Sequence, residues 1–424
     1  MHTLYTIIQI LTLLLLSPVL LLVALLPKYR GRVLQRLGLK GLPSQLPPHT
    51  GKRIWLHALS VGETASARPL VEAIRQSLPD ALIIFSSTTQ GAQEYRRCMA
   101  KEVDLFVAFP FDLSWVVRHF LARLQPHLFI LIETDFWPGF LHLLKSCKVP
   151  SMLANGRMKE GSFNNYYRFR TFFRPLFSSF DYLSMQTEKD RSFMLKLGVE
   201  PSKVVRLGNL KYDIEVSEQR HPAEERQIFG LAPHGLILVA GSTHRGEEKI
   251  LLQLYLHLLQ IEPELILILA PRDPARGKEI LEIASKLGLT AHLRSQSSNS
   301  PSQILILDTL GELKRIYGLA DLAFVGGSLV DQGGHNPLEP AVHGKPVLFG
   351  PYMSDFHEIS QALQEAGAAR VVENQQQLQQ TTKQLLADPK VRQQMGEQAA
   401  ALVQLHQGAT KDHISLIRKM LGEQ

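Results

Sequence analysis

A glutamate that directly follows a buried-strand pattern is the residue of this chain best placed for acid–base chemistry. The apolar run 54–59 ends in Ser60-Val61-Gly62-Glu63, a small-residue turn that opens a helix. Open sheets of parallel strands bind ligands at the edge where the strands end. Glu63 would lie in the positive field of the helix N-terminus, so we expect it to be ionised near neutral pH and able to accept a proton from a hydroxyl. A glutamate that only favours the helix start is the alternative.

Further charged residues follow other predicted strands of the first half of the chain. Glu133 comes directly after the run 128–132, Arg157 follows the run 151–154, and Lys211 follows the run 204–207. A carboxylate and two cations would therefore join Glu63 at one sheet edge. Asp135 forms a Glu-x-Asp pair with Glu133, but no second acidic cluster or histidine supports it, so we expect no metal site. A surface charge or a helix cap is the alternative for each residue.

The second half of the chain contains a glycine-flanked turn suited to a phosphate. Gly241 and Gly246 have the spacing of the two P-loop glycines, but Glu247-Glu248 replaces the Lys-Ser/Thr pair. This replacement disfavours nucleoside triphosphate hydrolysis. The turn still precedes a predicted helix, whose N-terminus can bind one phosphate. The candidate phosphate or sugar contacts are Ser242, Thr243 and His244 from this turn, and Gly334 from a later one.

The densest signal in the chain is the glycine-rich run from Gly326 to Glu339. Its glycines allow the backbone to approach a ligand closely, and Pro337 starts a helix. Glu339 in the first turn of that helix can accept hydrogen bonds from two ribose hydroxyls. Together with Pro271-Arg272 and Gly311-Glu312, which follow two other predicted strands, the run predicts a nucleotide site.

Alternating strand and helix patterns position all of these residues. Buried-strand patterns occupy 54–59, 81–87, 105–109, 128–132, 151–154, 182–185 and 204–207, and again 236–240, 265–270, 304–307, 322–325, 347–350 and 370–372. Helix-length segments such as 65–78 and 113–124 separate them. The polar stretch 212–225 predicts a linker. We therefore expect an α/β protein with two doubly wound, Rossmann-like domains facing a cleft, one over 31–214 and one over 215–424, the latter ending in helices.

The N-terminus predicts a membrane anchor over residues 1–30. Residues 3–26 contain no charge and are rich in leucine. A helix over this segment would be long enough to cross a bilayer. Basic residues follow it: Lys28, Arg30, Arg32, Arg36 and Lys40. The positive-inside rule then predicts cytoplasmic catalytic domains. A cleavable signal peptide would have its basic residues first, and a peripheral hydrophobic segment is the other alternative.

The overall charge limits the class of partner, and the cysteines indicate the redox compartment. The net charge of +7 indicates an anionic partner, either a membrane surface or an acidic substrate. The basic residues are scattered and no nucleic-acid motif is present, so we expect no nucleic-acid partner. The two cysteines, Cys98 and Cys147, form neither a disulfide framework nor a metal spacing and fit a reducing cytoplasm.

Five motifs in one order resemble a known family. Ser-Val-Gly-Glu (60–63), Glu-Thr-Asp-Phe-Trp-Pro (133–138), Gly-Asn-Leu-Lys-Tyr-Asp (208–213), Ser-Thr-His-x-Gly-Glu-Glu (242–248) and Gly-Gly-His-Asn-Pro-Leu-Glu (333–339) resemble those of the 3-deoxy-D-manno-octulosonic acid (Kdo) transferases of Gram-negative lipopolysaccharide synthesis. The anchor is also similar. Related glycosyltransferases share the GT-B fold but not these motifs together.

The resemblance implies an inverting transfer of Kdo from CMP-Kdo to the anionic lipid A precursor (lipid IVA) at the inner membrane, with no metal and no cofactor. By motif, Glu63 would be the general base, and Glu133 and Lys211 would stabilise the transition state. The implied CMP contacts are Pro271, Arg272, Leu310, Gly311, Glu312, Asn336, Pro337, Leu338 and Glu339. The chain departs from the family at Asp135-Phe136, where Glu-Leu is more frequent, and at Gly156-Arg157-Met158, where Ala-Arg-Leu is more frequent. Both departures concern the acceptor side.

Three other functions compete with this interpretation. Another GT-B transferase could use a UDP-sugar on a membrane acceptor, and competition between CMP and UDP would distinguish the two. A dinucleotide-dependent oxidoreductase is disfavoured because no GxGxxG follows a predicted strand. A membrane-anchored sugar-binding protein without activity is the third, since a fold alone does not establish catalysis. The charged residues Glu63, Glu133 and Lys211 argue against it.

Overall fold

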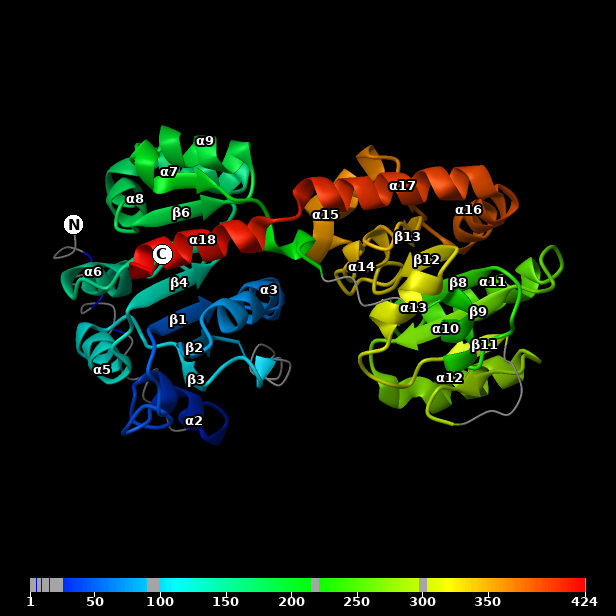
Figure 1. Cartoon of the computed structure of the whole chain (residues 1–424), viewed down its shortest axis with the longest axis horizontal. Helices are drawn as coiled ribbons and strands as arrows, with labels where there is room; N and C mark the ends of the chain where they lie inside the picture. Colours follow the sequence, from blue (N-terminus) through cyan, green and yellow to red (C-terminus); the bar gives the residue numbers. More distant parts are fainter. Residues whose placement is uncertain are drawn as a thin grey trace. The chain divides into compact units, whose positions relative to one another are not determined.

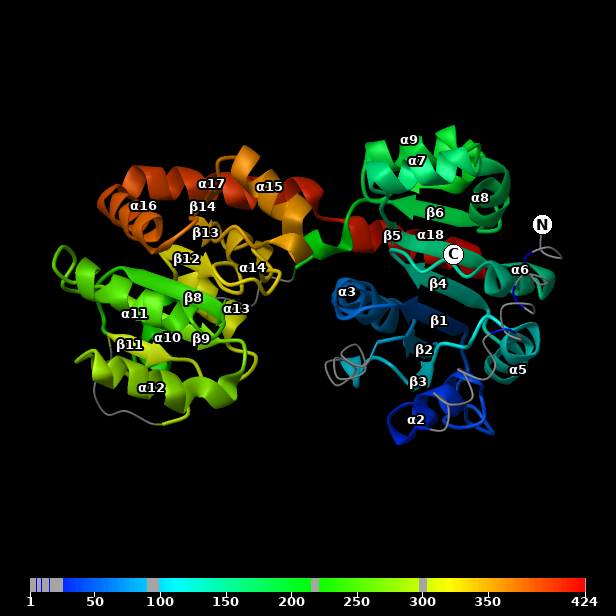
Figure 2. The same ribbon diagram turned by 180° about the vertical axis from the view of Figure 1, so that it is seen from behind.

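The chain folds into two α/β units, each built on a parallel sheet (Figures 1 and 2). The computed structural model describes Tyr5, Gln9, Leu15 and residues 26–89, 99–214, 221–296 and 303–423. One unit comprises residues 1–213 and 407–424, and the other comprises residues 214–406. The predicted α/β class with two doubly wound parallel sheets is confirmed.

Within the described residues, the first unit has a seven-stranded parallel sheet in the order β3-β2-β1-β4-β5-β6-β7. Its strands are β1 (Arg53–Ala58), β2 (Leu82–Ser87), β3 (Leu105–Ala108), β4 (Leu128–Ile132), β5 (Ser151–Gly156), β6 (Tyr182–Met185) and β7 (Val204–Arg206). Its helices are α2 (Pro27–Arg36), α3 (Val61–Ser77), α5 (Ser114–Leu124), α6 (Pro138–Ser146), α7 (Glu160–Arg168), α8 (Arg170–Phe177), α9 (Glu188–Lys196), η2 (Pro201–Lys203), η3 (Leu210–Tyr212) and α18 (Ala409–Leu421).

Both faces of the first sheet are apolar, as in a parallel sheet covered by helices on each side. Successive residues of β1 point to opposite faces. Ile54 and Leu56 pack with α3 and α18, whereas Trp55 packs with α5 and α6. The continuous apolar pattern of β1 therefore results from burial on both sides.

The last helix, α18, packs on the first unit, although the sequence analysis places it in the second domain. Asp213 accepts the backbone N–H groups of Gly408 (2.7 Å) and Thr410 at the helix start. Ile417 of α18 joins the same buried cluster as Ile74 of α3. Because the apolar face of α18 is buried against the first unit, this segment belongs to that unit. Figure 1 shows it there in red.

Within the described residues, the second unit has a seven-stranded parallel sheet in the order β10-β11-β9-β8-β12-β13-β14. Its strands are β8 (Ile237–Thr243), β9 (Ile266–Pro271), β10 (His292–Leu293), β11 (Ile304–Ile306), β12 (Leu322–Val325), β13 (Val347–Phe349) and β14 (Ala369–Val371). Its helices are α10 (Pro222–Ile228), α11 (Glu247–Leu258), η4 (Pro274–Arg276), α12 (Gly277–Lys286), α13 (Leu313–Leu319), α14 (Leu338–Ala341), η5 (Ser354–Phe356), α15 (His357–Glu365), α16 (Gln375–Ala387) and α17 (Pro389–His406).

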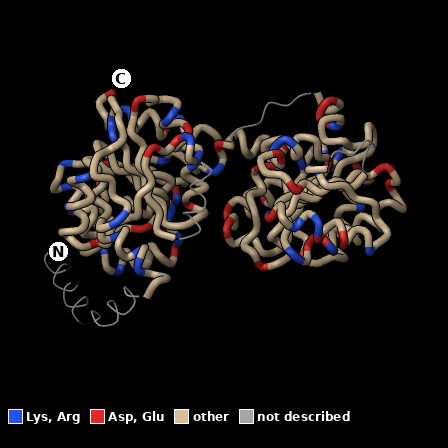
Figure 3. The backbone as a smooth tube through the Cα atoms, turned by 90° about the horizontal axis from the view of Figure 1, so that it is seen from below, with Lys and Arg blue, Asp and Glu red and all other residues tan. Residues whose placement is uncertain are grey.

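Most of the predicted anchor lies outside the described residues. Tyr5 donates its hydroxyl to Oδ2 of Asp112 at 2.6 Å, and Gln9 donates to the backbone carbonyl of the same residue. Asp112 also accepts the N–H of Gly139 in α6 (2.9 Å). Among the residues that the structure describes, no helix combines the length and the hydrophobicity that a bilayer crossing needs. Basic and acidic residues are interspersed in both units (Figure 3).

Candidate active site

The two candidate carboxylates of the first unit flank the point where its strand order reverses. β1 pairs with β2 on one side and with β4 on the other. The connections from these two strands leave in opposite directions, which opens a crevice at the carboxyl ends of the strands. Glu63 follows β1 and Glu133 follows β4, so both lie at this switch point.

The Glu63 carboxylate is held by a hydrogen bond on each oxygen. Ser60 caps α3 by accepting the N–H of Glu63 at 3.2 Å. Oε2 of Glu63 accepts the N–H of Leu59 at 2.6 Å, and Oε1 accepts the hydroxyl of Thr134 at 2.9 Å. The side chain is buried, with 7% of the residue exposed. Its orientation is therefore set by both the helix cap and the β4–α6 loop.

Burial raises the pKa of Glu63 from its usual 4.5 to about 7. Hydrogen bonds from Leu59 and Thr134 oppose this rise, and the nearby charge of Glu133 adds to it. The sequence analysis predicted an ionised carboxylate from the helix field alone and did not foresee the burial; a pKa of about 7 leaves Glu63 partly ionised near neutral pH. A carboxylate that titrates near neutral pH is well matched to general-base catalysis.

Glu133 is buried and is bound by residues at the end of β5. Its Oε1 accepts a hydrogen bond from Nδ2 of Asn155 at 3.1 Å, and its Oε2 lies 3.4 Å from Nε of Arg157. Glu133 and Asn155 both have positive backbone φ angles, of 59° and 57°. In non-glycine residues this backbone conformation costs about 1–3 kcal/mol each. It persists only where surrounding contacts hold it in place, often at functional sites.

Asn155 connects Glu133 to the short helix that contains Lys211. Its Oδ1 accepts the N–H of Leu210 at 3.0 Å, at the start of η3. Asn209 caps the same helix by accepting the N–H of Lys211 at 3.0 Å. The structure therefore brings Glu63, Glu133 and Lys211 to one sheet edge. The role of Asn155 was missed in the sequence analysis, since a buried amide at the end of a strand gives no distinctive signal without its partners.

The second unit repeats this arrangement at the ends of β8, β9 and β12. β8 lies between β9 and β12, so the strand order reverses here as well. The N–H of Arg272, after β9, donates to the carbonyl of Thr243 at the end of β8 (2.9 Å). The glycine-rich run begins directly after β12 at Gly326. Arg272 and the start of the glycine-rich run therefore lie at or beside the switch point of this unit, whereas Leu310, Gly311 and Glu312 follow β11, the strand on the far side of β9.

Two glycines of this run are required by close backbone or side-chain approach. A Cβ on Gly326 would lie 2.5 Å from the carbonyl oxygen of Ser242, which would push β8 and β12 apart. Gly334 has a φ of 72°, and a Cβ there would meet the sulfur of Met353 at 2.4 Å. These contacts explain the density of glycine in physical terms.

Glu247 of the Gly-Glu-Glu motif has a structural task that the sequence analysis did not assign. Its buried carboxylate accepts backbone N–H groups at 2.8–3.0 Å from His244, Gly327, Ser328 and Leu329. It thereby ties the turn after β8 to the turn after β12. Glu248 is also buried and pairs with Arg276 at 2.6 Å.

His244 and His335 form a stacked pair between these turns. Their Nε2 atoms lie 2.8 Å apart, and the ring planes differ by 9°. Burial lowers the pKa of His335 to about 4, with further lowering from Arg272 and His244. A neutral imidazole has one N–H, so one Nε2 donates and the other accepts. His244 was a candidate contact in the sequence analysis, whereas His335 was not singled out within its motif.

The remaining predicted nucleotide residues differ in their surroundings. Oδ1 of Asn336 accepts the N–H of Leu338, the first residue of α14, at 3.1 Å, and Glu339 lies in the first turn of this helix. Burial raises the pKa of Glu339, and the charges of Lys314 and Arg272 oppose the rise. Pro271 ends β9, Pro337 caps α14, Leu310 is 84% exposed, and Gly311 has a φ of 87°.

Glu312 is already engaged within the protein. Both of its carboxylate oxygens accept a hydrogen bond from Nε of Arg294, at 3.2 and 3.3 Å. Oε1 also accepts one from Nη2 of the same arginine at 3.1 Å. Thr309 donates to the same carboxylate. A nucleotide contact from Glu312 therefore has to share these partners. In the part of the chain that the structure describes, no group of three or more His, Cys, Asp or Glu side chains could hold a metal ion.

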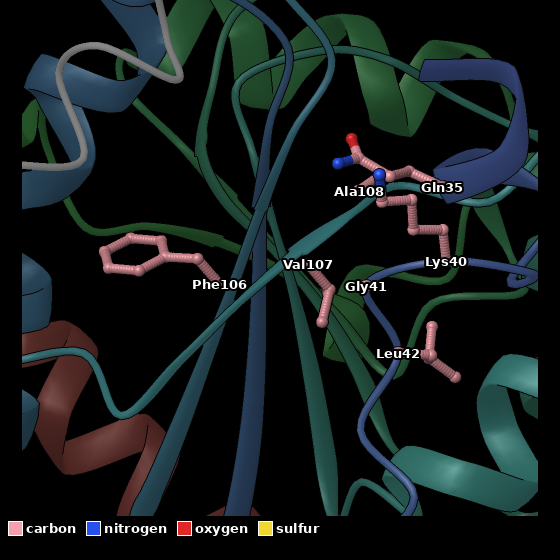
Figure 4. Close-up of a pocket in the computed structure, with 7 residues that line it drawn as sticks. All are labelled: Gln35, Lys40, Gly41, Leu42, Phe106, Val107 and Ala108. Carbon is pink, nitrogen blue, oxygen red and sulfur yellow. The ribbon is translucent and has the colours of Figure 1, made fainter. Parts of the chain in front are cut away.

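A small pocket lies away from both switch points, beside the edge strand β3. Its lining residues are Gln35, Lys40, Gly41, Leu42, Phe106, Val107 and Ala108 (Figure 4). None of the residues predicted as site residues lines it. The chemistry of the side chains, rather than this pocket, therefore locates the candidate site.

Comparison with known proteins identifies the family. Residues 31–214 match the family described as 3-deoxy-D-manno-octulosonic-acid transferase (kdotransferase). A 3-deoxy-D-manno-octulosonic acid transferase of Haemophilus influenzae is 31% identical over 400 residues, which cover 93% of this chain and 92% of that protein. The chain belongs to the Kdo transferase family. The transferase of Bordetella pertussis is 30% identical and covers 89% of this chain and 90% of its own length.

Solved structures with low sequence identity share the fold of this Kdo transferase. A UDP-GlcNAc 2-epimerase from Neisseria meningitidis covers 87% of this chain and 100% of its own, with a TM-score of 0.57 and 12% identity. A glycosyltransferase from Rickettsia africae covers 88% of this chain and 99% of its own, with a TM-score of 0.55 and 12% identity. These likenesses confirm the GT-B-type fold class expected from the sequence.

The chain is therefore an enzyme that transfers Kdo in lipopolysaccharide biosynthesis. The family predicted from the five motifs is therefore confirmed, and the similarity extends over nearly the whole chain. Within this Kdo transferase, the predicted catalytic residues lie in the first unit, whereas the predicted nucleotide residues lie in the second.

Proposed function

We propose that this Kdo transferase moves Kdo from CMP-Kdo to a hydroxyl of the lipid A precursor lipid IVA, with Glu63 as the general base. The observation that carries the proposal is a buried carboxylate at the switch point of the first unit, with both oxygens oriented by hydrogen bonds. Its pKa of about 7 leaves a large fraction unprotonated at neutral pH. Such a group can accept the proton of an attacking hydroxyl.

The proposed reaction needs one base and several stabilising charges. The acceptor oxygen bonds to the anomeric carbon of Kdo from the side opposite the bond to the CMP phosphate, which breaks, so the configuration inverts. The acceptor proton passes to Glu63. CMP leaves as a phosphate monoester, whose charge is stabilised by cations and helix N-termini without protonation. Lys211 would stabilise the anionic groups of the donor in the transition state. Glu133 would stabilise the positive charge that develops on the sugar ring in that state.

The second unit supplies the proposed CMP site. Arg272, the His244–His335 pair and the N-terminus of α11 would face the phosphate, and Glu339 would accept the ribose hydroxyls. Pro271, Leu310, Gly311, Glu312, Asn336, Pro337 and Leu338 would complete the contacts with CMP, and Ser242, Thr243 and Gly334 would line the phosphate and sugar. The buried hydroxyl of Thr243 has no hydrogen-bond partner among the described residues, which supports a ligand at this turn.

Removing a nucleotide contact should weaken CMP binding selectively. We expect Glu339→Ala to raise the Kd of CMP about 10- to 150-fold, which corresponds to about 1.5–3 kcal/mol for a hydrogen bond to a charged group. Arg272→Ala should weaken binding in the same direction. Isothermal calorimetry with CMP measures both changes, and Glu397→Ala on the exposed face of α17 is the matched control. Wild-type affinity in both site variants would show that the second unit has been misinterpreted.

The competing donor class is tested by calorimetric binding of CMP and UDP and by their inhibition of transfer. If the enzyme uses CMP-Kdo, CMP should bind and inhibit transfer, whereas UDP at the same concentration should do neither. Inhibition by UDP alone would favour the UDP-sugar alternative.

We further propose that the lipid acceptor approaches the first unit from helices α7 and α8, at the inner membrane on its cytoplasmic side. These helices follow β5, the strand whose end carries Asn155 and Arg157. α7 has no buried residue, and Phe169 between the two helices is 57% exposed. Arg168, Arg170 and Arg174 of these helices are exposed, and the guanidinium groups of Arg168 and Arg170 lie over the rings of Phe169 and Tyr167. Basic and aromatic side chains together suit the surface of an anionic lipid layer.

Replacing one aromatic and one basic side chain of this surface should weaken membrane binding. We expect Phe169→Ser combined with Arg170→Ser to lower binding to vesicles containing phosphatidylglycerol by about tenfold, from the loss of one basic and one apolar contact. Vesicle co-sedimentation measures this change. Leu405→Ser, at a 78% exposed apolar residue of the second unit, is the control. Unchanged vesicle binding of the double variant would exclude this face as the membrane contact.

A further inference from the structure

The loop between β4 and α6 holds its backbone in a conformation that its residues disfavour. Glu133 has a φ of 59° and Asp135 a φ of 95°, and neither is glycine. Thr134 lies between them and donates its hydroxyl to Oε1 of Glu63 at 2.9 Å. Non-glycine residues in such conformations need specific contacts that compensate the strain. The loop has such contacts on both sides of Thr134.

On one side of Thr134, the Glu133 side chain is the first attachment. It is only 3% exposed and accepts Nδ2 of Asn155, while Arg157 lies 3.4 Å from its other oxygen. The N–H of Glu133 also donates to the carbonyl of Ala154 at 2.9 Å. The start of the loop is therefore tied to β5.

On the other side, Asp135 is tied to the core beneath β1. Its Oδ2 lies 2.9 Å from Nε2 of His57, which is fully buried and stacks on Phe109 with ring centroids 3.7 Å apart. Nδ1 of His57 lies 3.0 Å from the hydroxyl of Ser86, and that hydroxyl accepts Nε1–H of Trp55 at 2.8 Å.

The direction of these hydrogen bonds follows from the protonation of His57. Burial lowers the pKa of His57, which favours the neutral ring. The single N–H of a neutral ring, when it lies on Nε2, donates to the Asp135 carboxylate. Nδ1 lies near both the hydroxyl and the backbone carbonyl of Ser86, at 3.0 and 3.1 Å, and the same hydroxyl donates to the carbonyl of Leu56 at 3.3 Å. These contacts connect Trp55 through Ser86 and His57 to Asp135.

We propose that Thr134 is a positioning residue for Glu63, and that the two flanking attachments serve to aim its hydroxyl at the carboxylate. This inference rests on the proposed role of Glu63 as the base. The hydroxyl fixes Oε1 while Leu59 fixes Oε2, so the remaining lone pairs of the carboxylate have one orientation. A donated hydrogen bond also favours the ionised carboxylate, which is the form that accepts a proton.

Other charged groups near Glu63 remain the same when Thr134 is changed. Glu133 faces it from the same loop, and Lys211 belongs to η3, which packs against α3. From α18, also packed on α3, the buried His413 has its pKa lowered to about 4 and stays neutral above pH 5. His57 and Asp135 pair with each other. A shift in the titration of Glu63 would therefore report the loss of the Thr134 hydroxyl.

The test compares Thr134→Val, which removes the hydroxyl at nearly constant volume, with Thr134→Ser, which keeps it. For Thr134→Val we expect the acid limb of the single-turnover rate to move up by about one pH unit, so that the rate near pH 6 falls about tenfold. The rate above pH 9 should fall less, and Thr134→Ser should restore the wild-type profile. Thr134→Ala supplies a second removal of the hydroxyl, and thermal unfolding verifies that each variant is folded.

The possible outcomes separate this inference from the proposed function. If Thr134→Val and Thr134→Ala keep the wild-type pH profile while Glu63→Gln is inactive, Thr134 has no positioning role and the base assignment stands. If Thr134→Val lowers the rate equally at every pH, the residue acts on structure alone and the inference is overturned. If Glu63→Gln keeps its turnover, the proposed function fails first.

Discussion

The Glu63→Gln variant is expected to transfer Kdo at least about 100-fold more slowly than the wild type, the usual contribution of general-base catalysis. Gln keeps the size and the hydrogen-bonding reach of Glu but lacks a basic lone pair. CMP affinity should stay near the wild-type value because the proposed CMP contacts all come from the second unit. Single-turnover transfer and calorimetry with CMP measure the two properties on the same preparation.

A matched control for this variant lies on the same helix. Glu72 of α3 pairs with Arg68 at the surface, so Glu72→Gln should leave turnover unchanged. If Glu63 only favoured the start of α3, Glu63→Gln would cost about 0.3–1 kcal/mol of stability and leave turnover nearly intact. Near-normal turnover of Glu63→Gln would therefore remove the base from the mechanism.

The Lys211→Met variant should lower turnover by about 100- to 1000-fold, the scale of losing one preorganised electrostatic contact in an active site. Met keeps most of the apolar stem but removes the ammonium group that would face the anionic donor. Asn209 and Asn155 fix η3 through backbone N–H groups, so the helix should remain in place. Steady-state kinetics should show the loss mainly in kcat.

The exposed Lys196 at the end of α9 gives a control of the same chemistry. Lys196→Met removes one positive charge from the first unit without touching the switch point, and its turnover should equal that of the wild type. A similar loss in both variants would indicate an effect of net charge. A Lys211→Met enzyme with normal kcat would exclude the cation from the reaction.

Much of the fold could be predicted from the sequence because parallel strands buried on both faces are continuously apolar. Runs such as 128–132 and 322–325 match β4 and β12 residue for residue. The two-residue strand His292–Leu293 was missed because it is too short to carry a periodic pattern. The last helix was placed in the wrong unit because an amphipathic pattern shows that a face is buried but not which sheet covers it.

The candidate site could be predicted as a set of strand-end residues, but its internal contacts could not. Glu63 and Glu133 follow adjacent strands, and sheet topology alone brings them together. The pKa of Glu63 is raised by burial among residues distant in sequence, which its position at a helix start does not reveal. Thr134 acts through one hydrogen bond to Glu63, and Glu247 through hydrogen bonds from three residues of the turn after β12; these partners lie far along the chain, so no local pattern encodes them.

The pH dependence of single-turnover Kdo transfer tests the central claim most directly, because it follows the proton that Glu63 would accept. A protonated Glu63 cannot act as a base, so the wild-type rate should rise with pH and level off above a midpoint near the Glu63 pKa of about 7. In Glu63→Gln, the slow remaining reaction should lack this limb. A limb with the same midpoint in Glu63→Gln would show that another group accepts the proton and would contradict the account.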